Sequence, residues 1–77
     1  MKVHVRLFST LARYSPSPGG EFVVDMEGSA SVGELLEFLK LPSAVQRVVL
    51  VNGRHAKSFK VLSEGDRVTM FPPMTGG

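Results

Sequence analysis

One short amphipathic helix is predicted near the middle of the chain, over residues 32–40. Ser31 and Glu34 have the spacing of a capping box, in which each side chain satisfies a free backbone N–H at the helix start. Pro42 ends the pattern. A helix with one apolar face buries it against another layer, so the rest of the chain must supply a sheet for it to cover. The residues of that face recur at helical spacing and are Val32, Leu35, Leu36 and Leu39.

Strand patterns occupy most of the remaining sequence. Each is marked by alternating polar and apolar side chains, which is typical of half-buried strands, or by a run of β-branched residues. Asn52-Gly53, a strong signal for a tight turn, separates the third strand from the fourth. Together with the helix they predict an α+β fold, with a mixed sheet of about four to five strands and the helix across one face. The predicted strands are residues 2–8, 21–26, 47–51, 54–56 and 67–71.

The connections between the strands carry turn chemistry. Residues 11–14 predict one helical turn, and residues 15–20 are a loop rich in Pro and Gly. Val61 and Leu62 are expected to anchor a later connection to the core, and residues 63–66 form a turn before the last strand.

Composition argues against several kinds of site. The chain has 77 residues, which is one small domain, and it has no cysteine. His4 and His55 lie far apart in the sequence, so we expect no metal site. The formal net charge is +2, and the lysines and arginines are scattered without interleaved aromatic residues, so we expect no nucleic-acid partner. No signal-peptide pattern and no apolar run of membrane-spanning length is present, so we predict a cytoplasmic protein without a membrane partner.

The end of the sequence has a composition of its own. Two prolines follow Phe71, and since neither can donate a hydrogen bond to a sheet, the chain is expected to leave the fold extended. The final glycines carry no Cβ, so no side chain hinders a partner that approaches the carboxylate of Gly77. We interpret residues 1–71 as the domain and residues 72–77 as a working tail; a frayed end with chance glycines is the alternative. The tail is made of Pro72, Pro73, Met74, Thr75, Gly76 and Gly77.

Phe8 and Phe71 are candidate partner-binding residues. Strand parity places both on the polar faces of their strands. If the first and last strands are neighbours, the two rings lie close together and beside the tail. Exposed apolar patches usually mark a partner site, and aromatic residues are favoured anchors there. The alternative is that Phe8 folds under the loop at residues 9–20.

The sequence of residues 64–77, EGDRVTMFPPMTGG, resembles the end of the MoaD family, the small subunits of molybdopterin synthase. The family pattern there is a Gly-Asp turn, an apolar strand, Phe-Pro-Pro and a terminal Gly-Gly. Val51-Asn52-Gly53 resembles the family's tight turn, and residues 3–8 with 11–14 resemble its first strand and short helix. The related thiamine carrier ThiS shares the Asn turn, the Gly-Asp and the Gly-Gly, but it does not usually have Phe-Pro-Pro.

The resemblance implies a β-grasp, ubiquitin-like fold and a carrier function. An ATP-dependent, MoeB-like enzyme would adenylate the Gly77 carboxylate. A sulfur donor, such as a cysteine desulfurase or a rhodanese, would then convert it to a thiocarboxylate. A MoaE-like large subunit, in a heterotetramer with this chain, would receive the sulfur for molybdenum cofactor synthesis. ATP serves the activating partner, so no bound cofactor is expected, and the chain alone is not expected to be an enzyme.

The resemblance also implies a docking surface. Positions that match Phe8 and Phe71 face the large subunit in the family, and the position that matches His55 lies there too, although it is usually apolar. Two other uses of the tail stay open: sulfur transfer to the thiamine thiazole, and conjugation of Gly77 to a lysine as a ubiquitin-like modifier. A simple binding module, whose terminal glycines are accidental, is a further alternative. The choice between molybdenum and tungsten is open as well.

Overall fold

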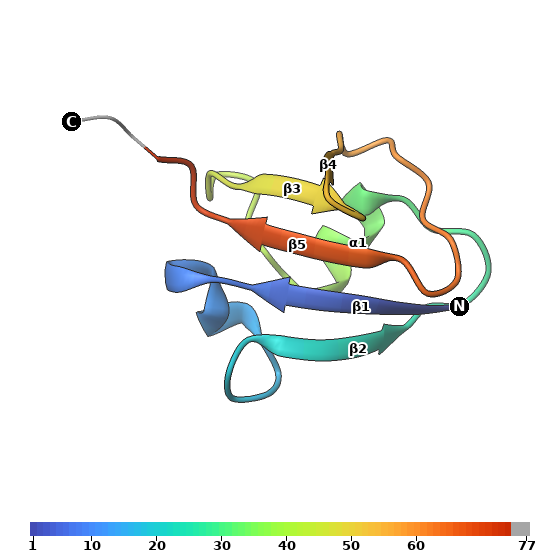
Figure 1. Cartoon of the computed structure of the whole chain (residues 1–77), viewed down its shortest axis with the longest axis horizontal. Helices are drawn as coiled ribbons and strands as arrows, with labels where there is room; N and C mark the ends of the chain where they lie inside the picture. Colours follow the sequence, from blue (N-terminus) through green and yellow to red (C-terminus); the bar gives the residue numbers. More distant parts are fainter. Residues whose placement is uncertain (75–77) are drawn as a thin grey trace.

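The computed structural model describes residues 1–74, so the predictions for Thr75, Gly76 and Gly77 lie outside the described residues. The chain forms a five-stranded sheet in the order β2-β1-β5-β3-β4, and helix α1 (Val32–Phe38) lies behind this sheet in Figure 1. A 3₁₀ helix, η1 (Ser9–Tyr14), follows the first strand and is longer than the single turn that we predicted. The strands are β1 (Lys2–Leu7), β2 (Glu21–Asp25), β3 (Val48–Val51), β4 (Arg54–His55) and β5 (Arg67–Phe71).

The first and last strands are neighbours at the centre of the sheet. β1 runs parallel to β5, with Val5 opposite Val68, whereas the other three strand pairs are antiparallel. This central pairing of the chain ends is the feature that a β-grasp fold requires, and it confirms the predicted fold class. It also places the end of β1 beside the end of β5 and the start of β3 (Figure 1).

Helix α1 begins as predicted and ends two residues early. The Ser31 hydroxyl oxygen accepts from the Glu34 N–H at 3.2 Å, and Glu34 Oε1 accepts from the Ser31 N–H at 3.3 Å, which completes the capping box. At the other end Lys40 has φ of 59°, and its N–H and that of Leu41 donate to Glu37 and Leu36. This is a Schellman motif, in which the left-handed residue turns the chain and stops the helix.

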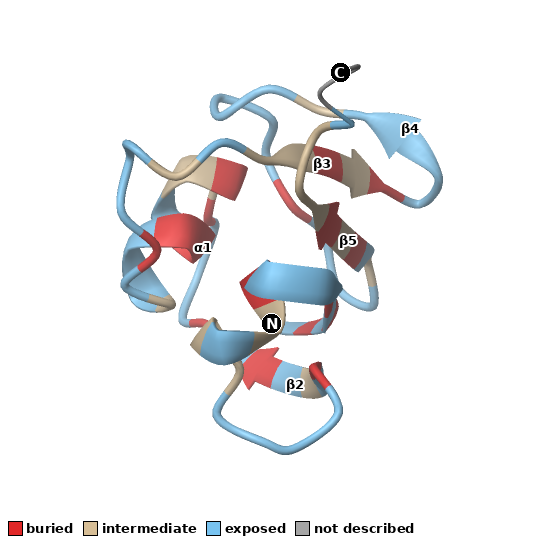
Figure 2. Ribbon diagram, turned by 90° about the vertical axis from the view of Figure 1, so that its left-hand side faces the viewer, coloured by how far each residue is buried: buried red, intermediate tan, exposed pale blue. Residues whose placement is uncertain are grey.

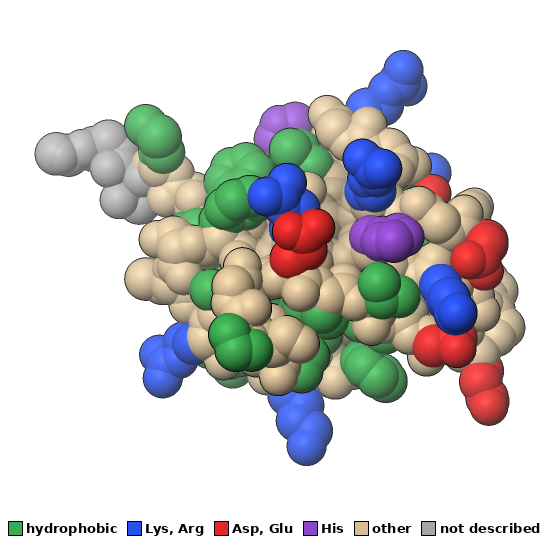
Figure 3. All heavy atoms as spheres, turned by 60° about the horizontal axis from the view of Figure 1, so that its bottom comes forward, with side chains coloured by type: hydrophobic (Ala, Val, Ile, Leu, Met, Phe, Trp, Pro, Cys, Tyr) green, Lys and Arg blue, Asp and Glu red, His purple; other side chains and the backbone are tan. Residues whose placement is uncertain are grey.

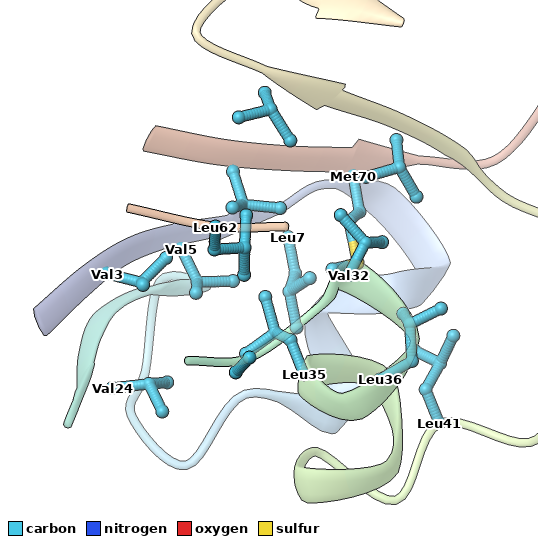
Figure 4. Packing of buried hydrophobic residues seen from close by; sticks show 14 of the residues in the cluster. Val3, Val5, Leu7, Val24, Val32, Leu35, Leu36, Leu41, Leu62 and Met70 are labelled. Atoms are coloured by element: carbon cyan, nitrogen blue, oxygen red, sulfur yellow. The ribbon is translucent and has the colours of Figure 1, made fainter. Parts of the chain in front are cut away.

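The core lies between α1 and one face of the sheet. The buried side chains of β1, β5 and the helix point into this space, as Figure 4 shows, and Figure 2 colours the buried residues of the sheet and the helix red. Val61 and Leu62 were both expected to anchor the connection before β5 to the core. Only Leu62 is buried, whereas Val61 is 55% exposed. The apolar residues at the centre of this cluster are Val3, Val5, Leu7, Leu11, Val24, Val32, Leu35, Leu36, Leu62, Val68 and Met70.

A hydrogen-bonded network ties the β3–β4 turn to the start of β5. Asn52 and Gly53 both have positive φ, 52° and 84°, as a type I′ turn requires. The Asn52 side chain donates to Asp66 Oδ1 at 3.0 Å and accepts from the Arg67 N–H at 2.9 Å. Asp66 Oδ2 in turn accepts from the Ser63 N–H at 2.8 Å. The Asn turn and the Gly-Asp pair therefore hold β5 in place.

Replacement of Asn52 by Ala is expected to lower the free energy of unfolding by about 2 kcal/mol. The change removes two hydrogen bonds and puts a residue with a Cβ but no local hydrogen bond into a left-handed conformation. Asn52→Gly is the matched control, since it loses the bonds but tolerates the backbone angle, and we expect about half the effect. Urea denaturation of the three proteins measures this; equal stability of Asn52→Ala and wild type would contradict the role of the network.

Candidate functional site

The base of the tail lies at the end of β5. Phe71 is the last residue of the strand and is half-buried, as are Pro72 and Pro73 after it. Met74 is 96% exposed. The chain therefore leaves the sheet here and passes from packed to exposed backbone within three residues (Figure 1).

The rings of Phe8 and Phe71 lie on the sheet face that α1 does not cover, called here the outer face. Leu7 pairs with Met70, and the Phe8 N–H donates to the Met70 carbonyl at 3.0 Å, so the next residues along the two parallel strands are Phe8 and Phe71. Phe8 is 43% exposed, and the Arg6 guanidinium carbon lies 5.1 Å from the centre of its ring. Phe8 thus stays on the outer face instead of folding under the loop.

Two apolar residues that the sequence analysis did not single out extend this surface. Val48 is paired with Phe71, and Leu50 is paired with Thr69, and both are only half-buried. The outer patch is therefore Phe8, Phe71, Val48 and Leu50. The sequence did contain a signal for an exposed apolar surface here. Alternate residues of the unbroken apolar run of β3 must face outward.

His55 lies beside this patch but apart from the two phenylalanines. It pairs with Leu50 across β3 and β4 and is exposed at the edge of the sheet. The structure thus brings Phe8 and Phe71 together at the base of the tail. His55 lies in the row of Leu50 and Thr69, two residues along the strands from the row of Val48 and Phe71.

The other half of the outer face is polar and cationic. His4, Arg6, Arg67 and Thr69 line a shallow hollow of about 600 Å³ there, and Glu21 forms an exposed ion pair with Arg6 at 3.7 Å. Figure 3 shows hydrophobic side chains gathered near the base of the tail, with charged and His side chains beyond them. A partner on this face would meet an apolar half and a charged half.

Residues 1–74 contain no group of three His, Cys, Asp or Glu side chains placed to hold a metal ion. No helix within that range combines the length and the apolarity needed to cross a bilayer.

A sheet with its first and last strands paired, one covering helix and an apolar patch at an extended end defines the class of ubiquitin-like, β-grasp proteins. The chain belongs to the ThiS family, whose model matches residues 5–77. The resemblance noted in the sequence is therefore confirmed at the level of the MoaD/ThiS-like sulfur-carrier fold.

Solved structures give the same picture. The chain is similar to small archaeal modifier protein 1 of Haloferax volcanii, with 30% identity, coverage of 95% of this chain and 98% of that one, and a TM-score of 0.78. It is similar to ThiS of Geobacter metallireducens, with 26% identity, coverage of 96% and 99%, and a TM-score of 0.60. It shares its fold with a chain in the complex of subunits 1 and 2 of molybdopterin-converting factor from Helicobacter pylori, with 22% identity, full coverage of both and a TM-score of 0.67. No curated protein matches the sequence.

Proposed function

We propose that this chain is a sulfur carrier that serves as the small subunit of a molybdopterin synthase. The observation that carries the proposal is the Phe71-Pro72-Pro73 base of the tail, which starts on the outer patch beside Phe8. A partner that covers this patch is held at the point where the tail begins. Its active site then needs only to reach along the six tail residues to Gly77.

The chemistry takes place on the Gly77 carboxylate. A carboxylate is a poor electrophile until one oxygen becomes a good leaving group, and adenylation with ATP, with release of pyrophosphate, supplies that group. The terminal sulfur of a persulfide on a sulfur donor, such as a cysteine desulfurase or a rhodanese, then attacks the acyl-adenylate and displaces AMP. A second thiol forms a disulfide with the donor's cysteine and releases the thiocarboxylate from the resulting acyl disulfide. The activating enzyme binds the ATP, so this chain is the substrate of that step, the sulfur acceptor in the second step and the sulfur donor in the third.

The residues of the tail suit insertion into narrow partner sites. Gly76 and Gly77 keep the tail thin, and Pro72 and Pro73 stiffen its base, which lowers the entropy lost on insertion. The partners we propose are a MoeB-like adenylating enzyme and a MoaE-like large subunit on the outer patch, in the cytoplasm. The Helicobacter pylori protein, which forms a complex of its subunits 1 and 2, is a precedent for the second.

A second candidate function is protein modification. It is favoured by the 30% identity to small archaeal modifier protein 1. In that function a lysine of a target protein captures the activated Gly77 and forms an isopeptide bond.

The ThiS family match also favours a third use, in which the same thiocarboxylate supplies the sulfur of the thiamine thiazole. The chemistry up to the adenylate is common to all three.

Mass spectrometry of the C-terminal peptide tests the proposal. The protein is incubated with ATP, a MoeB-like enzyme and a sulfur donor, and fragmentation places the change on a residue. This assignment is essential, because oxidation of any of the four methionines gives nearly the same mass shift as exchange of oxygen for sulfur. We expect the exchange on Gly77; an unchanged Gly77 with new lysine adducts on other proteins would favour the modifier function instead.

Replacement of Phe71 by Ala is expected to weaken binding to the large subunit by about 30-fold or more, as for a buried aromatic anchor. Stability should fall by only about 1 kcal/mol, since the ring is half-buried on the outer face. Val23→Ala is the matched control, because Val23 is 54% exposed on the same face but lies on β2, away from the tail. Titration calorimetry and urea denaturation measure the two effects. Comparable losses in binding and stability would mean that Phe71 acts as a core residue.

A further inference from the structure

A second charged surface follows β4 and is separate from the outer patch. From residue 38 to residue 63 the sequence has no Asp or Glu. Three of the cations in this stretch lie within residues 54–60, which contradicts the view that the lysines and arginines are scattered. Arg54, His55 and Lys60 line one hollow of about 420 Å³, and the Lys60 N–H donates to the Lys57 carbonyl at 3.0 Å. The β4 surface is defined as Arg54, His55, Lys57, Phe59 and Lys60.

Phe59 lies between Lys57 and Lys60 in the sequence, is exposed, and sits on a backbone that is held in place. Phe59 is 76% exposed, compared with 59% for Phe38 and 43% for Phe8. On either side of it the loop is fixed to the first turn of α1, because the Gly33 N–H donates to Ser58 at 2.8 Å and the Val32 N–H donates to Lys60 at 2.9 Å. Glycine suits this close approach, since a Cβ on Gly33 would lie in a tight contact of 3.2 Å with the Ser58 oxygen. The loop thus presents Phe59 on a rigid support, as a preorganised binding surface does.

The cations of the β4 surface are not neutralised within the described part of the chain. Its two ion pairs join Met1 to Asp25 and Arg6 to Glu21, away from this surface. The helix packed against the loop carries Glu34, but that carboxylate accepts from the N–H and hydroxyl of Ser31 in the capping box. The positive charges therefore face solvent and are available to a partner. Figure 2 shows β4 fully exposed.

We propose that the β4 surface binds a short acidic segment of a partner protein. The carboxylates of the segment would pair with Arg54, Lys57 and Lys60, and an apolar side chain of the segment would cover Phe59. Charge complementarity favours an acidic partner, and an exposed aromatic residue favours a protein anchor. His55 belongs both to this surface and to the edge of the outer face, so a partner could cover both.

The charges around the surface favour a peptide segment over a nucleic acid. Glu34 and Glu37 lie on the neighbouring helix, and Glu64 and Asp66 follow soon after Lys60 in the chain. These carboxylates would repel a long polyanion that runs beyond the cations more than they would repel a short segment. Nucleic-acid grooves also use several aromatic residues in a row, and this surface has one.

Selection from a phage-displayed library of random linear peptides against the full chain tests the proposal. We expect enrichment of peptides that combine Asp or Glu with apolar residues. In ¹⁵N NMR spectra a selected peptide should shift the amide signals of residues 54–61. The double variant Lys57→Glu/Lys60→Glu should weaken binding of the peptide about 10-fold or more, and Phe59→Ala should weaken it several-fold. High salt should also weaken binding of the peptide to the wild-type chain. Lys57→Arg/Lys60→Arg is the matched control, which keeps the charges and should keep the binding.

Four results would overturn the proposal, and none depends on whether Gly77 carries sulfur. They are no enrichment of any peptide, enrichment of peptides without an acidic excess, amide shifts confined to β1 and β5, and tighter binding of a short single-stranded oligonucleotide than of the best peptide. Circular dichroism of each variant shows whether it is folded. Because these side chains are exposed, we expect all the variants to keep the fold.

Discussion

Deletion of Gly77 is expected to abolish sulfur loading and to leave the fold intact. The deletion moves the terminal carboxylate back by one residue, roughly 3.5 Å along an extended chain. A misplacement of even 1 Å at a reacting centre costs about 100-fold in rate, so loading should fall at least that far. Within residues 1–74, all the buried residues of the core precede the tail, so the free energy of unfolding should not change.

The matched control for this deletion is Met74→Ala. Met74 is almost fully exposed, and its replacement leaves both the length of the tail and the position of the carboxylate unchanged. Loading of this variant should therefore resemble that of wild type in the same mass-spectrometric assay. Sulfur found on Gly76 of the shortened chain would contradict a fixed distance to the partner's site, and unfolding of that chain would contradict a tail independent of the core.

Replacement of Gly20 by Ala is expected to have the largest effect on stability, a loss of about 3 kcal/mol or more. Gly20 has φ of 74°, where a residue with a Cβ costs about 1–2 kcal/mol. A Cβ there would also lie 2.3 Å from the backbone oxygen of Leu7, so the backbone must move. The Leu7 N–H donates to the Gly20 carbonyl at 2.7 Å, and therefore the end of β1 would move with it.

Gly19→Ala separates the two causes of this loss. Gly19 has a similar backbone angle, φ of 91°, but nothing lies within 4 Å of an added Cβ. The difference in unfolding free energy between the two variants, measured in urea, is the cost of the collision with Leu7. Equal losses would show that the loop relaxes freely around Gly20. A shift of the end of β1 would also displace the neighbouring Phe8, so binding at the outer patch offers a second measurement.

Local patterns in the sequence predicted the elements of this fold but not their arrangement. The capping box of Ser31 and Glu34, the alternation in β1 and β2 and the Asn52-Gly53 turn are all formed by residues close in the sequence, and the structure has each of them. The pairing of β1 with β5 joins residues far apart, and no local pattern encodes it. In the sequence analysis it was a condition that the patterns left open, and only the resemblance to a family implied it.

The candidate site was predictable to a similar extent. Parity placed Phe8 and Phe71 on the outer face, because alternation holds along any regular strand. Val48 and Leu50 were missed because β3 is apolar on both faces, so the run alone does not say which residues pack inside. The β4 surface was missed for a different reason, since Arg54 and Lys60 line the same hollow only after the loop folds back onto α1.

The central pairing of β1 with β5 also governs how the molecule folds. Val5 and Val68 are 63 positions apart in the sequence, so the entropy of closing a long loop opposes their contact until much of the sheet is formed. Chains with many such distant contacts fold more slowly than helical bundles of the same size. Strand β5 carries the base of the tail, and Phe71 and Phe8 become neighbours only through this pairing. A partly folded chain therefore lacks the assembled patch, and a partner that recognises the patch selects folded molecules.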